Sequence, residues 1–262
     1  MKLLALLFCL IPRCIVAGTP FLNAGAEATA LSGIQLFAGN SFLGINNLSM
    51  QKPDKGTVGI SLQKPYFLSE VMQLDGIFTK PYKKHHGVIY FRNMKAPSYS
   101  NSAFGLGIGF QIHPKIQTAI QTELQSEHIS NYGTTLGNSW KIAFTSLPFA
   151  KCQLAWLIAF NLPDKFRTSL SVNHVFALQY SMNKTSKLIS EIQWQQDQTP
   201  ILKTGISFQL NKQWQLLSGF TFSNAQLAAG LTYKKHQISY GFAIRYHQVL
   251  GSGHAIHVCY DL

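Results

Sequence analysis

The last eight residues of the chain, Ala255–Leu262, alternate strictly between two faces. Ile, Val, Tyr and Leu fall on one side, and Ala, His, Cys and Asp fall on the other. In a soluble protein such a terminal strand would be an open sheet edge that other chains can pair with. In a closed membrane barrel the last strand pairs with the first, and no edge remains. The ending therefore favours a membrane-spanning β-barrel.

The N-terminus has the pattern of an export signal. Met1-Lys2 gives a basic start, Leu3–Pro12 an apolar run, and Val16-Ala17-Gly18 a small-residue cleavage region. The apolar run is too short for a membrane-spanning helix, which needs about 20 residues. We expect residues 1–18 to be a signal peptide, so that the mature chain begins near Gly18 or Thr19.

Downstream, segments with a period of two recur between polar turns, which is the signature of a transmembrane barrel. A soluble β-sandwich is the alternative for any single segment, but it rarely sustains so many. An even number of about fourteen strands is predicted. The expected strands are Thr57–Gln63, Val71–Lys80, Gly87–Arg92, Ala103–Ile112, Lys115–Gln125, Trp140–Ser146, Cys152–Phe160, Ser169–Ser181, Lys187–Gln195, Leu202–Leu210, Gln213–Phe222, Gln226–Tyr233, Gln237–His247 and Ala255–Leu262.

The composition agrees with strands that are half apolar and half polar. Hydrophobic residues make up 46% of the chain, yet charged residues are only 12%, about half the share in a soluble domain. Two cysteines, Cys152 and Cys259, remain after the signal peptide. A disulfide framework needs more, so we interpret both as packing residues. The four tryptophans fall on apolar faces, where an interfacial aromatic girdle would place them.

The connections form two predicted classes. One class is longer and rich in Ser, Asn and Gly, as in Arg92–Ser102, Ser126–Ser139, Asn161–Thr168 and His247–His254. The other class is tight and basic, without Asp or Glu. Because outer-membrane barrels have short periplasmic turns and longer outer loops, we expect both termini to be periplasmic. The basic turns contain Lys83, Lys84, Lys115, Lys151, Lys184, Lys187, Lys212, Lys234 and Lys235.

The formal net charge is +12, and much of the excess lies in these turns. Binding to nucleic acid is excluded as an interpretation, because the sequence has no basic helix and no aromatic RNA-binding signature. The turns are expected to contact anionic outer-membrane lipids. The alternative is an acidic periplasmic protein partner.

The segment Ala24–Phe37, AGAEATALSGIQLF, followed by GINNL at Gly44–Leu48, resembles the N-terminal signature of FadL-like outer-membrane barrels, in particular their PorV/PorQ-type branch in Bacteroidetes. The resemblance implies a bacterial outer-membrane location and a hatch at residues 19–55 inside a fourteen-stranded barrel at residues 56–262. One departure is Asn46-Asn47-Leu48-Ser49, which replaces the Pro-Ala-Gly part of the family motif. The implied hatch residues are Gly25, Ala26, Ala28, Gly33, Asn46 and Asn47.

The resemblance implies a non-enzymatic subunit or accessory of an outer-membrane secretion or assembly complex, similar to type IX secretion, with a larger membrane complex as its partner. It also permits a FadL-like channel for hydrophobic small molecules. The family's transport members carry long outer loops that capture ligand, and the predicted loops here are short. Independently of the family, the small residues of the hatch allow close packing on a barrel wall, and Gly105, Gly107 and Gly109 could supply a flat surface.

No catalytic, metal or cofactor site is predicted. The GxGxG pattern at Gly105–Gly109 lies within an expected strand and is not followed by a helix. His247, His254 and His257 surround one hairpin, but the last two have opposite strand parity. A membrane-embedded enzyme remains the third functional alternative. The polar lumen is predicted to contain charges paired with each other or with the hatch, namely Glu123, Lys141, Glu191, Lys203 and Arg245.

Overall fold

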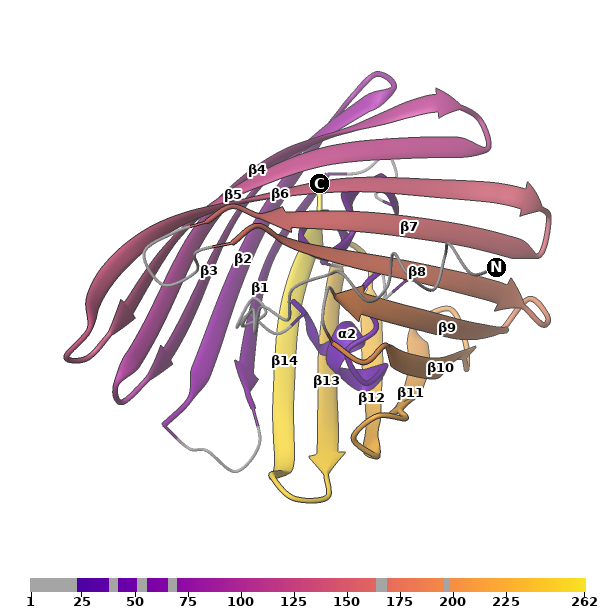
Figure 1. The fold of residues 1–262 in the computed structure, drawn as a ribbon. Coiled ribbons are helices and arrows are strands. Elements are labelled where there is room, and N and C mark those ends of the chain that lie inside the picture. Colours follow the sequence, from indigo (N-terminus) through magenta and orange to yellow (C-terminus); the bar gives the residue numbers. More distant parts are fainter. Residues whose placement is uncertain (1–22, 38–41, 51–55, 66–69, 164–168, 196–197) are drawn as a thin grey trace, which may run out of the picture.

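The computed structural model describes residues 23–37, 42–50, 56–65, 70–163, 169–195 and 198–262. Within them, fourteen antiparallel strands each pair with the next, and β14 closes on β1 (Figure 1). This confirms the predicted closed barrel. The signal peptide predicted at residues 1–18 lies outside the described residues. The strands are β1 (Thr57–Lys64), β2 (Met72–Tyr82), β3 (His85–Ala96), β4 (Tyr99–His113), β5 (Ile116–Ile129), β6 (Gly133–Phe149), β7 (Cys152–Asn161), β8 (Ser171–Ser181), β9 (Ser186–Gln195), β10 (Ile201–Gln209), β11 (Trp214–Thr221), β12 (Gln226–Lys235), β13 (Ile238–His247) and β14 (Gly251–Asp261).

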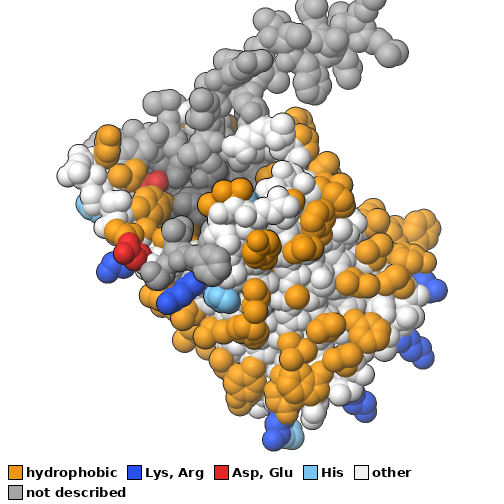
Figure 2. Space-filling model, turned by 90° about the horizontal axis from the view of Figure 1, so that it is seen from below, with side chains coloured by type: hydrophobic (Ala, Val, Ile, Leu, Met, Phe, Trp, Pro, Cys, Tyr) orange, Lys and Arg blue, Asp and Glu red, His pale blue; other side chains and the backbone are white. Residues whose placement is uncertain are grey.

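Alternating residues of each strand face the interior and the exterior of the barrel. In β13, Tyr240 and Phe242 are exposed on the outer face, whereas Ser239 and Ala243 are buried on the inner face. Hydrophobic side chains likewise cover much of the outer surface seen in Figure 2, with Lys and Arg toward its margins. Since neighbouring strands satisfy each other's backbone groups and the exterior is apolar, the barrel is suited to a bilayer.

Several connections predicted to be long are tight turns, which corrects the loop-length classes. The β3–β4, β5–β6 and β13–β14 connections are only residues 97–98, 130–132 and 248–250. Part of the connection at Asn161–Thr168 lies outside the described residues. The strands extend past the apolar belt, where outward positions such as Thr134 and Asn138 are polar. Pairing of backbone groups continues there although only some of the outward side chains, such as Leu136, are apolar, so hydrophobic periodicity underestimated the strand lengths.

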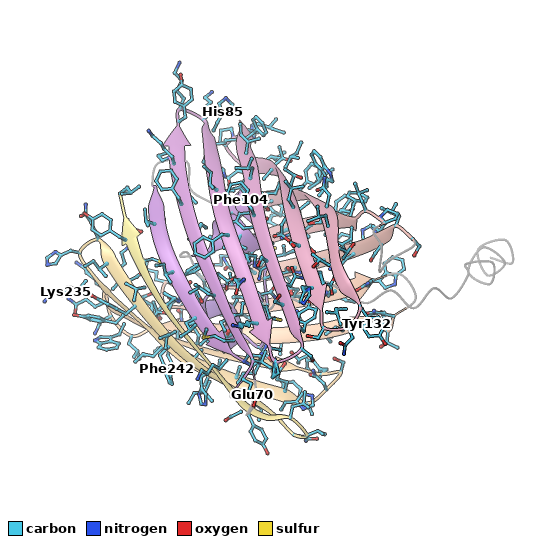
Figure 3. All side chains as sticks on the ribbon, turned by 90° about the vertical axis from the view of Figure 1, so that its left-hand side faces the viewer. Glu70, His85, Phe104, Tyr132, Lys235 and Phe242 are labelled. Carbon is cyan, nitrogen blue, oxygen red and sulfur yellow. The ribbon has the colours of Figure 1, made fainter. Side chains whose placement is uncertain are left out.

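The lysine-rich turns predicted from sequence lie together at one end of the barrel. The turns that follow the even-numbered strands lie at the same end as the start of β1 and the end of β14. We call this end the basic rim. In the described part of the opposite rim, Lys64 and Lys95 are balanced by Glu70 and Glu127. Figure 3 shows His85 and Lys235 at the basic rim and Glu70 and Tyr132 at the other. The basic rim carries Lys83, Lys84, Lys115, Lys151, Lys184, Lys212, Lys234 and Lys235.

The N-terminal part of the chain lies inside the barrel. Helices α2 (Ala26–Ala30) and α3 (Leu43–Asn46) and the 3-10 helix η1 (Leu48–Met50) are buried almost completely. Helix α2 packs against β11–β14, α3 against β2 and β3, and η1 against β4–β6. None of the helices in the described segments is long and apolar enough to cross a membrane. The core of the molecule is therefore the contact between this plug and the barrel wall.

Candidate functional site

The candidate site is the plug and the space around it. We use the term hatch for its described parts, residues 23–37 and 42–50. The side chain of Asn46 accepts a hydrogen bond from the backbone N–H of Ala24 at 2.9 Å and donates one to the Ala24 carbonyl oxygen at 2.8 Å. Asn47 donates to the carbonyl oxygen of Leu36 at 3.1 Å. The two asparagines therefore tie the two parts of the hatch together.

Small hatch residues occupy positions where larger ones would not fit. Gly25 has φ +90°, and an added Cβ would lie 2.9 Å from the ring of Phe42. Gly33 has φ +81° but more space around it. Ala26 and Ala28 are completely buried on α2. Glycine is needed at Gly25 for both conformation and space, and at Gly33 mainly for conformation.

The glycines that face helix α2 and the residue after it lie on β10, β11 and β12. The predicted glycines lie on β4, on the other side of the barrel. An added Cβ at Gly219 would overlap the backbone of Leu31, and one at Gly230 would come within 2.6 Å of the Cβ of Ala30. Gly205 similarly faces the side chain of Leu31. These three glycines allow the hatch backbone to lie directly on β10, β11 and β12.

The predicted platform of Gly105, Gly107 and Gly109 is only partly used by the hatch. The rings of Tyr90 and His86, from the neighbouring strand β3, cover Gly105 and Gly109. Gly107 alone faces a hatch side chain, Leu48. A glycine in a sheet leaves space that a large cross-strand neighbour can fill, so parity alone could not show which glycines the hatch would use.

A buried ion pair grips the hatch on one side. The Glu191 carboxylate accepts hydrogen bonds from the backbone N–H groups of Gln35 and Leu36 at 2.9 and 3.0 Å. Lys203 donates to the Gly33 carbonyl oxygen at 2.7 Å and pairs with Glu191 at 3.2 Å. Both side chains are nearly excluded from solvent. Hydrogen bonds to charged groups contribute about 1.5–3 kcal/mol each, so this clamp is a strong attachment.

A second charged group lies on the wall formed by β2–β6. Glu123 and Lys141 are 4.0 Å apart, and Arg92 pairs with Asp75 at 3.0 Å. Sequence reasoning missed the Arg92–Asp75 pair, although both residues have inward parity and lie directly opposite in the register. Arg245, the fifth predicted lumen charge, is buried in the inner face of β13.

Neutral groups attach the rest of the hatch. The side chain of Gln121 donates to the Gly44 carbonyl oxygen at 2.6 Å, and His86 Nε2 lies 2.7 Å from that of Leu48. The N–H of Ala26 donates to His257 Nδ1 at 3.1 Å. His257 thus contacts the hatch. The described residues contain no cluster of three or more His, Cys, Asp or Glu suited to a metal ion.

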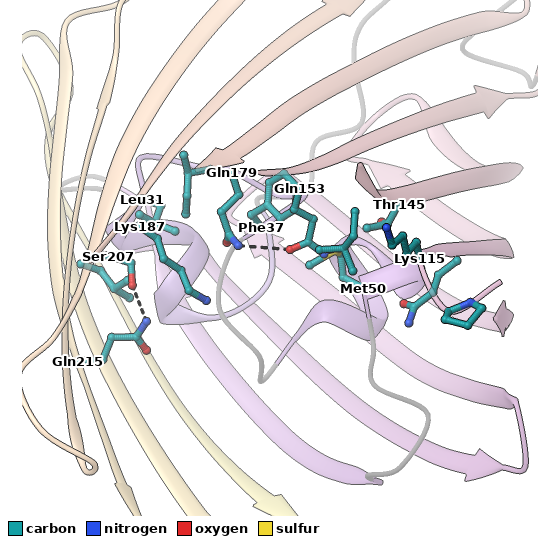
Figure 4. Close-up of a pocket in the computed structure, with 15 residues that line it drawn as sticks. Leu31, Phe37, Met50, Lys115, Thr145, Gln153, Gln179, Lys187, Ser207 and Gln215 are labelled. Carbon is teal, nitrogen blue, oxygen red and sulfur yellow. Dashed lines mark hydrogen bonds between the residues drawn. The ribbon is translucent and has the colours of Figure 1, made fainter. Parts of the chain in front are cut away.

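A cavity of about 350 Å³ lies between the hatch and the basic rim (Figure 4). Leu31, Phe37 and Met50 of the hatch contribute apolar surface to it. Lys187 was predicted at the boundary between a basic turn and a strand. It is the second residue of β9, which begins at Ser186, and it lines this cavity. Among the described residues, no carboxylate lines the cavity. Its polar lining consists of Lys115, Gln117, Thr145, Gln153, Gln179, Lys187, Ser207 and Gln215.

The fold of this chain is a closed barrel with an N-terminal hatch inside it. No family model and no curated protein matches the sequence. Several solved structures are similar to the fold. The toluene transporter TodX of Pseudomonas putida aligns with 92% of this chain and 98% of its own, with a TM-score of 0.64 at 9% identity.

Two other solved barrels are similar to the same extent. The CymD monoaromatic hydrocarbon channel has a TM-score of 0.64 at 7% identity, covering 93% of this chain and 98% of its own. A Pseudomonas aeruginosa FadL homologue has a TM-score of 0.63 at 8% identity, with the same coverage. At these identities the likeness establishes a FadL-like barrel fold. The PorV/PorQ-type branch remains a prediction from sequence.

Proposed function

We propose that this protein is an outer-membrane channel for small hydrophobic molecules and not an enzyme. The observation that carries the proposal is the cavity beneath the hatch, because part of its lining belongs to the hatch itself. A molecule crossing the lumen would reach the basic rim through this cavity once the hatch is displaced. The apolar surfaces of Leu31, Phe37 and Met50 suit a hydrophobic molecule. The solved barrels of the same fold include a toluene transporter and a monoaromatic hydrocarbon channel.

We favour the channel over the secretion-complex subunit, which was the first function implied by the sequence resemblance. The ranking changes because the similar solved barrels are named as a transporter and a channel. The short connections of the rim opposite the basic rim differ from the long outer loops of the family's transport members, so the proposal rests on the cavity beneath the hatch and on the similar solved barrels. A larger complex and an acidic protein partner therefore remain expectations from sequence.

Filling the cavity tests the proposed route. Gln179 lines the cavity from β8, while its neighbour Leu178 faces outward and is exposed. We expect Gln179→Trp to reduce saturable uptake of a labelled monoaromatic hydrocarbon by at least about tenfold, because an indole occupies much of a cavity of this size. Leu178→Trp is the matched control and should leave uptake unchanged. Equal uptake in wild type and Gln179→Trp would rule out this cavity as the route.

We also propose that the basic rim faces the periplasm, as both termini would then do. The test uses single cysteines in a Cys152→Ser background, because Cys152 lies at the basic rim and is only partly buried. Val249→Cys and Ser130→Cys, in turns of the opposite rim, should react with an impermeant thiol reagent on intact cells. Asn211→Cys, in a turn of the basic rim, should react only after permeabilisation. The reverse pattern would show the opposite orientation.

A further inference from the structure

A groove of about 320 Å³ lies on the outer surface of the basic rim. It runs beside the β12–β13 turn, formed by His236 and Gln237, and reaches the end of β14. The hydroxyl of Tyr260 donates to the side-chain oxygen of Gln237 at 2.5 Å, which fixes one wall. A volume equal to about ten water molecules accommodates a phosphate head group with its glycerol. The groove is lined by Lys235, His236, Gln237, Ile238, Tyr240 and Tyr260.

The position of the groove relative to the membrane follows from its aromatic neighbours. Four consecutive strands each carry an outward aromatic residue near this rim: Trp214 on β11, Tyr233 on β12, Tyr240 on β13 and Tyr260 on β14. The rings of Trp214 and Tyr233 are 4.4 Å apart. Aromatic belts of this kind lie at the level of the lipid head groups. Lys235 and His236, which follow the belt, therefore belong to the head-group layer.

The two consecutive lysines of β12 face different surroundings. Lys234 points to the lumen side and forms an ion pair with Asp261 at 2.5 Å. Lys235 has the outward parity of Tyr233 and lines the groove. None of the six lining residues is acidic, so the positive charge in the groove is not balanced by the groove itself. An ammonium group at this depth is suited to a phosphate.

We propose that this groove binds the phosphate head group of an anionic glycerophospholipid. Lys235 contacts the phosphate, His236 and Gln237 are positioned for further hydrogen bonds, and the acyl chains lie along Ile238, Tyr240 and Tyr260. The apolar part of the groove favours a lipid over free phosphate. The choice of a phospholipid over lipid A rests on the proposed periplasmic orientation of the basic rim, because phospholipids form that leaflet. The site lies outside the lumen, so it is separate from the transport route.

The test is native mass spectrometry of the whole barrel in neutral detergent, titrated with phosphatidylglycerol. We expect wild type to retain one lipid and Lys235→Glu to bind it about tenfold or more weakly, as expected when one charged phosphate contact is lost. Lys234→Gln removes a charge one residue away on the other face and should bind as wild type does. His236→Asn should weaken binding less than Lys235→Glu does, because the charge of Lys235 remains. Asn is chosen because it tolerates the left-handed backbone, φ 54°, of this turn residue.

Wild-type protein alone provides a second measurement, which does not depend on any variant folding. Phosphatidylglycerol should raise the thermal transition of the barrel, whereas phosphatidylcholine and inorganic phosphate should not. Equal binding by wild type and Lys235→Glu, or equal stabilisation by phosphatidylcholine or inorganic phosphate, would overturn the site. Preference for lipid A over phosphatidylglycerol would overturn the assigned lipid and the orientation.

Hydrocarbon uptake by Lys235→Glu should equal that of wild type, so failure of the lipid site and failure of the channel are seen in different assays.

Discussion

Replacing Glu191 with Ala is expected to release the hatch from the β9–β10 wall and to make the barrel leak small solutes. The substitution removes the acceptor of two backbone hydrogen bonds, from Gln35 and Leu36, and leaves the buried ammonium of Lys203 without its carboxylate. Loss of one partner from a buried pair costs about 3–5 kcal/mol. We expect a corresponding loss of stability in detergent, and faster hydrogen exchange at residues 33–36 than at residues 44–48.

The double variant Glu191→Ala, Lys203→Met separates the two effects. It still lacks the hydrogen bonds to the hatch but no longer buries an unpaired charge. Stability should therefore recover in part, while leakage and fast exchange at residues 33–36 should persist. Glu127→Ala, at the end of β5, is the control for loss of a carboxylate elsewhere. If Glu191→Ala neither leaks nor exchanges faster, the clamp does not hold the hatch.

Substituting Val for Gly219 is expected to displace α2 from the wall. An added Cβ at this position would overlap the backbone of Leu31, and backbone atoms cannot rotate out of the way as a flexible side chain can. Overpacking of this kind costs about 1–3 kcal/mol when the structure relaxes, and more when it cannot. We expect a lower thermal transition and increased solute leakage.

Gly87 on β3 supplies the matched control. An added Cβ there comes no closer than 3.9 Å to another group, so Gly87→Val should leave the hatch in place. Protease accessibility of the hatch separates displacement of α2 from a general weakening of the barrel. A Gly219→Val protein as resistant and as impermeable as Gly87→Val would contradict the packing of α2 on this wall.

Much of the barrel was predictable from sequence because β-strands impose a local rule. In β13 the alternation of Tyr240, Phe242 and Ile244 with small or polar residues assigns each side chain to a face without knowledge of any partner. The same parity placed Glu123, Lys141, Glu191 and Lys203 in the lumen. The rule weakened in β6, which begins at Gly133 and not at Trp140. There the backbone pairing continues where the outward side chains are no longer consistently apolar.

The contacts of the hatch were decided only by the tertiary structure. Glu191 and Gln35 are separated by 156 positions in sequence, and no local pattern relates them. The same holds for Leu31 on Gly219 and for Ala26 beside His257. Strand parity predicts that a side chain points into the lumen, but it does not predict which residues that side chain contacts. That depends on barrel closure and on the path of a segment that has no strand periodicity of its own.

The sequence by itself therefore determined the closed barrel, the inward and outward faces and the excess of lysine in one set of turns, because each depends on periodicity or composition within a few residues. Only the tertiary structure decided the short connections of the opposite rim, the glycines beneath α2, the clamp of Glu191 and Lys203, and the cavity beside them. These depend on strand register and on how the chain fills the lumen, where hydrogen bonding and exclusion of volume act between residues distant in sequence.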